Sequence, residues 1–274
     1  MRQPIGLCAA LACMACALAA GSAAQAAAPT RTNVRLAVRL LPYHLGQSSS
    51  IALALRIGAR GGGTPPRLER MEALYPQGFG IALSGLGIET CSAARLQARG
   101  PSGCPADSLM GRGRALGVPA GAGGSRREHA TITIVRAPNV HGHIALLFDA
   151  QGLGMSEHAV ILSALVLGAH SPYGGDIRVS VPPIGGDASG GEVSLISLSA
   201  TIGPAANLHY TERVRRHLLS YVPRGIALPE RCPRGGFPFA ARLAFEGGTS
   251  AEARTRVSCP PRRRGSASSG RRRR

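Results

Sequence analysis

Four cysteines in the body of the chain limit its folds more than any other sequence feature. Cys91, Cys104, Cys232 and Cys259 form an even set, which is typical of disulfides in an exported chain. Three connectivities are open, and the two sequence-local pairs, Cys91 with Cys104 and Cys232 with Cys259, need the least rearrangement of the chain. A four-thiolate zinc site would use CxxC spacings, which this part of the chain lacks. We therefore expect two local disulfides.

Residues 1–26 have the pattern of a secretory signal peptide. One positive charge precedes an apolar run that is too short to span a bilayer comfortably, and the small-residue site Ala24–Ala26 follows it. Cleavage after Ala26 removes Cys8, Cys13 and Cys16 and leaves no transmembrane anchor. We expect a secreted protein in an oxidising space, where the remaining cysteines pair.

Alternation of apolar and polar residues predicts short β-strands through most of residues 27–261. In Thr32–Leu41 the apolar residues Val34, Leu36, Val38 and Leu40 share one side, and Arg35, Ala37 and Arg39 share the other. The segment Phe237–Phe245, the glycines at 247 and 248, and the segment Ala251–Val257 predict a hairpin. This hairpin would bring Cys259 close to Cys232, within the reach of a disulfide.

The stretch Cys91–Gly113 joins a cysteine pair to the clearest helical signal. Thr90–Arg99 is rich in helix formers and ends at Gly100–Pro101, so a turn or two of helix is expected there. Ser108–Val118 then carries glycine at 111, 113 and 117. Such a nearly bare strand face favours close packing of another backbone or of a large side chain.

These elements predict an all-β protein, an antiparallel β-sandwich, either one large or two closely packed, with one or two short helices. The sandwich domain covers 27–261, and a subdivision would fall near 119–127. The apolar run Ala159–Leu167 fits either a strand or a short buried helix. Thr211–Val222 fits either a charged hairpin or a helix.

Positive charge is the strongest compositional feature. The chain carries 32 arginines, no lysine and 14 acidic residues, for a net charge of +18. Seven arginines lie in the tail 262–274, which lacks apolar residues and is expected to be disordered: Arg262, Arg263, Arg264, Arg271, Arg272, Arg273 and Arg274. Guanidinium groups bind phosphate and carboxylate in bidentate fashion, so anionic envelope polymers or lipid headgroups are the expected partners. The alternative is a tail that only keeps the protein soluble.

Three weaker patterns bear on chemistry. His141 and His143 would share a strand face and could hold a metal with His129, His158 or His170 and with Asp149. Scattered carboxylates could form a glycosidase pair: Glu157, Asp176, Asp187, Glu192 and Glu212. The loop 186–191 is similar to the nucleophile loop of serine proteases but has one residue too many.

None of these patterns has a second motif at the right spacing. We therefore predict no catalytic residues, no metal and no cofactor. Specific recognition of nucleic acid is not expected either, because the sequence has no recognition helix, zinc finger or aromatic stacking platform.

Two cysteine-containing blocks carry a resemblance to a known group. The first is Pro76-x-Gly78, then Cys91 with its short helix, then Cys104-Pro105-x-x-Ser108-x-x-Gly111-x-Gly113; the second is Cys232-Pro233-x-Gly235-Gly236-Phe237 with Phe239 and a closing Cys259-Pro260. Together they resemble secreted, uncharacterised proteins of high-GC actinobacteria. The resemblance implies an extracellular β-sandwich with no assigned activity.

The sequence thus predicts a secreted, disulfide-stabilised, non-enzymatic β-sandwich associated with the cell envelope through its basic charge. An envelope hydrolase or carbohydrate-active enzyme, with a site built from scattered acids and histidines, is the alternative. Recognition of a partner by addition of an edge strand is a third interpretation.

Overall fold

The computed structural model describes residues 32–81, 89–119, 127–153, 159–184, 192–203, 210–221 and 225–260. The expected signal peptide and arginine tail lie outside these ranges, as does most of the segment 119–127. The predictions for those parts of the chain stay predictions.

Strands make up most of the described chain. They are β1 (Thr32–Leu41), β2 (Ser48–Ala59), β3 (Leu68–Pro76), β4 (Gly80–Ile81), β5 (Leu109–Pro119), β6 (Glu128–Val140), β7 (His143–Leu153), β8 (Ala159–Gly168), β9 (Tyr173–Ser180), β10 (Val193–Ile202), β11 (Tyr210–Val214), β12 (His217–Tyr221), β13 (Ile226–Ala227), β14 (Phe237–Phe245) and β15 (Ser250–Val257). The described α-helix is α2 (Ala93–Arg99), and single 3₁₀ turns span Pro101–Gly103, Ala106–Ser108 and Glu246–Gly248. The prediction of a mostly antiparallel β protein with a short helix after Cys91 is confirmed.

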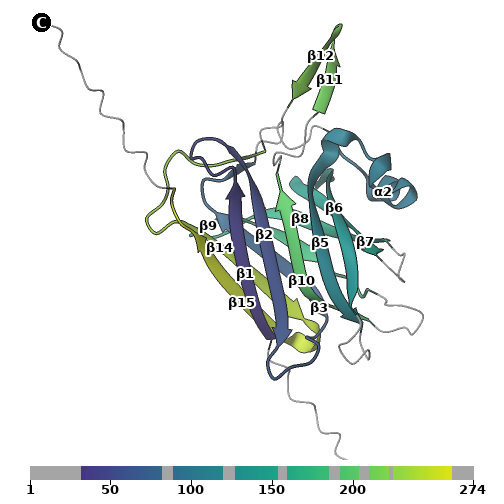
Figure 1. Cartoon of the computed structure of the whole chain (residues 1–274), viewed down its shortest axis with the longest axis vertical. Helices are drawn as coiled ribbons and strands as arrows, with labels where there is room; N and C mark the ends of the chain where they lie inside the picture. The colour runs from purple at the N-terminus through teal and green to yellow at the C-terminus, as the bar shows by residue number, and fades with distance from the viewer. Residues whose placement is uncertain are drawn as a thin grey trace, which may run out of the picture.

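Nearly all of the strands belong to one antiparallel sheet. Its order is β15-β14-β3-β9-β8-β7-β6-β5-β10-β2-β13-β4, and β1 pairs with β2. The sheet curls until β1 lies beside β15, which makes it nearly closed and barrel-like (Figure 1). A sandwich of two packed sheets is therefore not confirmed. Alternation along a strand shows which side is buried, but a flattened closed sheet and a sandwich produce the same alternation.

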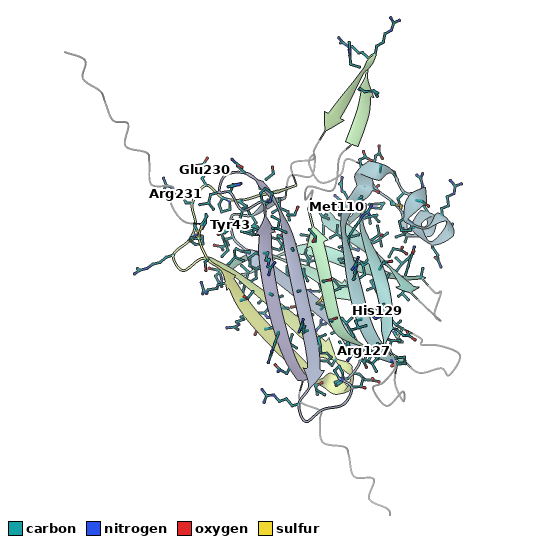
Figure 2. The ribbon with its side chains drawn as sticks, in the orientation of Figure 1. Tyr43, Met110, Arg127, His129, Glu230 and Arg231 are labelled. Carbon is teal, nitrogen blue, oxygen red and sulfur yellow. A yellow bond between two sulfur atoms is a disulfide. The ribbon has the colours of Figure 1, made fainter. Side chains whose placement is uncertain are left out.

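The interior of this closed sheet is the main core. Inward side chains from most of its strands are buried together, among them Leu55, Ile134, Leu146, Val179 and Leu243. Aromatic rings gather at one end, where Phe79 contacts Phe237 and Phe239 edge to face at centroid distances of 5.2 and 5.8 Å. We call this the Tyr43 end and the opposite end the His129 end, after residues labelled in Figure 2.

The glycines of β5 allow the sheet to bend tightly. A Cβ atom at Gly111 would overlap the carbonyl oxygen of Thr201, and one at Gly113 would overlap that of Ser199. Both oxygens belong to the neighbouring strand β10, so the expectation that another backbone packs against this bare strand is confirmed. β5 consequently contributes little side-chain volume to the interior.

The helix α2 covers the outside of the sheet near the Tyr43 end. Ser92 caps it, because its Oγ accepts a hydrogen bond from the N–H of Arg95 at 3.2 Å. Leu96 and the Cys91–Cys104 disulfide pack on Val135 and Leu147 of β6 and β7. A small second core therefore forms on the outer side of the closed sheet.

The other predicted details resolve as follows. Cys232 and Cys259 form a disulfide at the open end of the β14–β15 hairpin, with Cα atoms 5.8 Å apart. Ala159–Leu167 is a strand rather than a buried helix. Its sequence is apolar throughout because both faces of the strand pack against other residues. β11 and β12 form a separate hairpin that projects beyond the rest of the sheet (Figure 1).

Candidate anion-binding surface

Five exposed arginines share one outer side of the closed sheet. Arg35 and Arg39 come from β1, Arg56 from β2, and Arg112 and Arg114 from β5. They point outward because the alternate residues of the same strands belong to the apolar interior. We call these five residues and the surface between them the arginine face.

The strand register places the arginines on two sides of a strip of small residues. Arg39 is level with Ala52, Thr201 and Arg112 on successive strands. Since neighbouring strands are about 4.8 Å apart, the backbones of Arg39 and Arg112 are separated by about 14 Å. Ala54 and Ser199 continue the small-residue strip one step along the strands, next to Arg114.

This strip forms a hollow. A concave region of about 790 Å³ lies over β1, β2, β10, β5 and β6. Arg39, Arg112 and Arg114 line it, together with the hydroxyl-bearing residues Ser199 and Thr201. Long donors around a floor of short side chains leave room for an anionic group to approach several guanidinium groups at once.

No acidic partner of the arginine face occurs among the described residues. The described ion pairs of arginine lie elsewhere, at residues that include Arg67, Arg70, Arg178, Arg242 and Arg254. Arg35 is moreover directly opposite Arg56 on the neighbouring strand. Like charges in that position are destabilising. An anion bound between them would remove this repulsion.

The opposite outer side of the sheet has paired charges. In the row across β9, β3, β14 and β15, Arg178, Glu72, Arg242 and Glu252 alternate in sign on successive strands. Glu72 lies 3.3 Å from Arg178, and Glu252 lies 3.6 Å from Arg242. We call this surface the paired face, and it also includes Asp176, Arg70 and Arg254.

Glu252 of the paired face contacts two arginines. Both oxygens of Glu252 accept hydrogen bonds from Arg254, at 2.9 and 3.1 Å. These hydrogen bonds and the charges of Arg254 and Arg242 lower the pKa of Glu252. The same contacts raise the pKa of Arg254. The positive charges here are neutralised within the protein, which leaves them less available to an external anion.

The described histidines are not arranged as the metal site considered from the sequence would require. His141 lies in the turn between β6 and β7 with a positive φ of 49°, so it does not share a strand face with His143. His129 lies near the other end of the 13-residue strand β6. Among the described residues, no three histidine, cysteine or acidic side chains form a group that could hold a metal ion.

Asp149 has a different environment from the one predicted. It is buried and opposite Thr133, and its Oδ2 accepts a hydrogen bond from Nε2 of Gln151 at 2.8 Å. Burial raises its pKa, and the hydrogen bond from Gln151 lowers it by a smaller amount. This carboxylate is satisfied within its own strand and makes no contact with a histidine.

The scattered carboxylates are not brought together where they are described. Asp176 is paired with Leu74 in the register of β3 and β9, whereas Glu192 lies 2.8 Å from Arg67, just before β3 begins. Leu74 and Leu68 of β3 are about 20 Å apart along the strand. Glu157, Asp187 and the serine loop 186–191 lie outside the described residues, as does the side chain of Glu212.

The predicted anion-binding arginines of the tail also lie outside the described residues. The arginine face itself was not predicted from the sequence. One signal for it was visible, because Arg35, Ala37 and Arg39 share a side of their strand. The contribution of β5 was not visible, since it depends on β10 lying between β2 and β5.

Comparison with protein-family models, with curated proteins and with solved structures found no match. The class of protein is therefore assigned from the fold alone. It is a mostly antiparallel β protein with two disulfides, which are typical of oxidising, extracellular surroundings. Every helix in the described ranges falls short of the length and apolar character that a bilayer span requires.

Proposed function

We propose that the protein is secreted and is held at the cell envelope by anionic polymers that bind the arginine face, without catalysing a reaction. The observation that carries this proposal is a face of five exposed arginines with no acidic partner among the described residues; three of them, Arg39, Arg112 and Arg114, line one hollow. The Arg-rich tail adds seven charges of the same sign.

The chemistry favours phosphate or carboxylate groups. Each guanidinium has a planar array of donors that matches two oxygens of such a group. Arg112 and Arg114 are two residues apart on one strand, so their side chains leave β5 about 7 Å apart. A polymer that repeats an anionic group can therefore contact both arginines and reach Arg39 across the hollow.

A polymer fits this surface better than a bilayer does. Proteins that lie on membranes insert large apolar or aromatic side chains below the headgroups. The large apolar residues that are well exposed in the described chain, Leu41, Val140 and Leu218, lie on different elements and form no patch. The small residues of the hollow are alanine, glycine, serine and threonine, and the large apolar residues of its lining, Leu53 and Ile132, pack with the interior core, so neither set provides such an anchor.

A polyphosphate column tests the proposal directly. The mature chain, residues 27–274, should be retained and should elute with increasing NaCl, because exposed charges are screened by salt. Replacing Arg112→Gln and Arg114→Gln together should weaken retention by about ten-fold at physiological salt. The matched control is Arg242→Gln with Arg254→Gln on the paired face, which removes the same net charge and should elute close to the wild type.

Three further arms separate the sources of binding. Equal elution of the two double variants would show that net charge alone, and not the arginine face, causes retention. Loss of retention only after deletion of 262–274 would assign binding to the tail. Strong binding to anionic lipid vesicles with no retention on polyphosphate would indicate that the binding partner is a membrane surface rather than a polymer.

A further inference from the structure

Two apolar cavities lie inside the closed sheet, one beyond the other along its axis. The first, of about 60 Å³, is towards the Tyr43 end and is lined by residues that include Val38, Leu53 and Phe79. The second, of about 150 Å³, is towards the His129 end and is lined by residues that include Leu162, Val179 and Leu195. Protein interiors seldom contain voids of this size, and apolar cavities of 150 Å³ bind small hydrocarbons.

The side chain of Met71 lines both cavities. It is 8 % exposed and projects from β3 into the interior, and it is the residue that the two linings share. Methionine is unbranched and has three rotatable bonds, so it adapts to different occupants more easily than leucine or valine. Met71 is therefore the side chain at which the linings of the two spaces meet.

The space exists because small residues stand at inward positions. Ala115, Ala130 and Ala150 line the second cavity from three neighbouring strands, and Gly117 and Gly152 add no side chain. The chain has no tryptophan and only five phenylalanines, and the aromatic rings that contact one another lie at the Tyr43 end. Larger apolar residues at these alanines would fill the second cavity.

The second cavity has polar residues at one end only. Arg67, Glu128 and His129 line it at the His129 end, where Arg67 also contacts Glu69 and Glu192 at 3.2 and 2.8 Å. Among the described residues that line the first cavity, farther inside, none is charged. Such an arrangement suits a molecule with one apolar chain and one polar end.

We propose that the interior binds a single unbranched alkyl chain, with its polar end near Arg67 and its methyl end pointing past Met71 towards the first cavity. The shape follows from two narrow spaces in line, and the orientation follows from the charged residues at the His129 end. This site is separate from the arginine face, because its lining faces inward. Its occupant does not depend on envelope binding.

Titration with 1-octanol, followed by NMR of ¹³C-methyl-labelled methionine, tests this proposal. After removal of residues 1–26 the chain contains only Met71, Met110 and Met155. We expect a saturable shift of the Met71 methyl resonance, assigned with a Met71→Leu variant, and a smaller shift for Met110, which lines the first cavity alone.

Two independent variants fill the second cavity. Ala150→Leu and Ala115→Leu should each weaken octanol binding by at least about ten-fold, because the added side chain occupies the site. Ala244→Leu, which changes a residue outside both linings, should bind as the wild type does. The melting temperature of each variant shows that it is folded.

The proposal is overturned if the Met71 resonance does not shift up to the solubility limit of octanol, or if the filled variants bind as well as the wild type. The Arg112 and Arg114 variants should bind octanol as the wild type does, even where they lose polyphosphate binding. Failure of one proposal can therefore be distinguished from failure of the other.

Discussion

The arginine face and the paired face are built on the same sheet but handle positive charge in opposite ways. The paired face sets Arg70, Arg178, Arg242 and Arg254 against Glu72, Asp176 and Glu252, and each of these arginines has a carboxylate within 4 Å. The arginine face has five arginines and no described acidic partner, and it even sets Arg35 opposite Arg56. A basic composition alone therefore does not explain where charge is available for binding.

The difference identifies the surface whose positive charges have no described partner within the protein. Cross-strand pairs of opposite charge contribute modestly to stability, and like pairs reduce it. The paired face contains cross-strand and neighbouring pairs of opposite charge formed by Glu72, Asp176 and Glu252. The arginine face has the like-charged pair Arg35 and Arg56, and a bound anion would remove the cost of that pair. The four predictions below test this difference, from the largest expected effect to the smallest.

Charge reversal should have the largest effect. Arg112→Glu with Arg114→Glu should reduce polyphosphate affinity by about 100-fold or more, because it replaces two attractive contacts by two repulsive ones. The fold should remain intact, since neither arginine has an ion-pair partner in the described chain. Arg242→Glu with Arg254→Glu should instead lower the melting temperature, because both new carboxylates face Glu252. A reversed outcome, with binding lost only on the paired face, would contradict the comparison.

Removing an acid should make the paired face resemble the arginine face. In Glu252→Gln, Arg242 and Arg254 lose their shared partner, so the melting temperature should fall by about 1–3 °C. Retention on polyphosphate should increase at the same time, because two guanidinium groups become available. Calorimetry and the column measure the two effects on one sample. A stability loss without stronger retention would mean that freed arginines on this face do not bind anions.

The pH dependence of Glu252 follows from its lowered pKa. A carboxyl with a lowered pKa in the folded state stabilises the protein above its ordinary pKa of 4.5, and this contribution is lost as pH falls through the folded value. The melting temperatures of the wild type and Glu252→Gln should therefore differ at pH 7 and converge as the pH falls below the ordinary value. A difference that persists at the most acidic pH would assign the effect to packing.

The smallest effect is expected at the like-charged pair. Arg35→Gln should raise the free energy of unfolding in urea by about 0.2–1 kcal/mol, because it removes the repulsion from Arg56. Saturating polyphosphate should abolish this gain, since the bound anion already screens the pair in the wild type. If Arg35→Gln is destabilising in the absence of ligand, the two arginines do not repel each other in the folded protein.

Sequence periodicity predicted the strands well and their order poorly. Alternation identified β1, and local pairing placed Cys259 near Cys232 across the β14–β15 hairpin. These features depend on neighbours in the sequence. The insertion of β3 between β14 and β9, which sets Met71 beside both Leu243 and Val179, depends on contacts between distant segments. That long-range order also decides between a sandwich and a nearly closed sheet.

The candidate site shows the same limit. Arg35 and Arg39 could be assigned to one side of their strand from the sequence, but Arg112 becomes level with Arg39 only because β10 pairs with both β2 and β5. The histidine metal site that was weighed and set aside fails for a local reason. It needed His141 on a strand beside His143, whereas the chain turns there, with Gly142 also at positive φ.

Retention of the purified protein, residues 27–274, on washed cells of the producing organism tests the central claim most directly. Wild type, the Arg112→Gln and Arg114→Gln variant, and the Arg242→Gln and Arg254→Gln variant would be compared at physiological salt, by the fraction bound to cells and the fraction in the medium. We predict that the first double variant moves into the medium while the second stays on the cells with the wild type. Equal distribution of the two charge-matched variants would contradict a role for the arginine face.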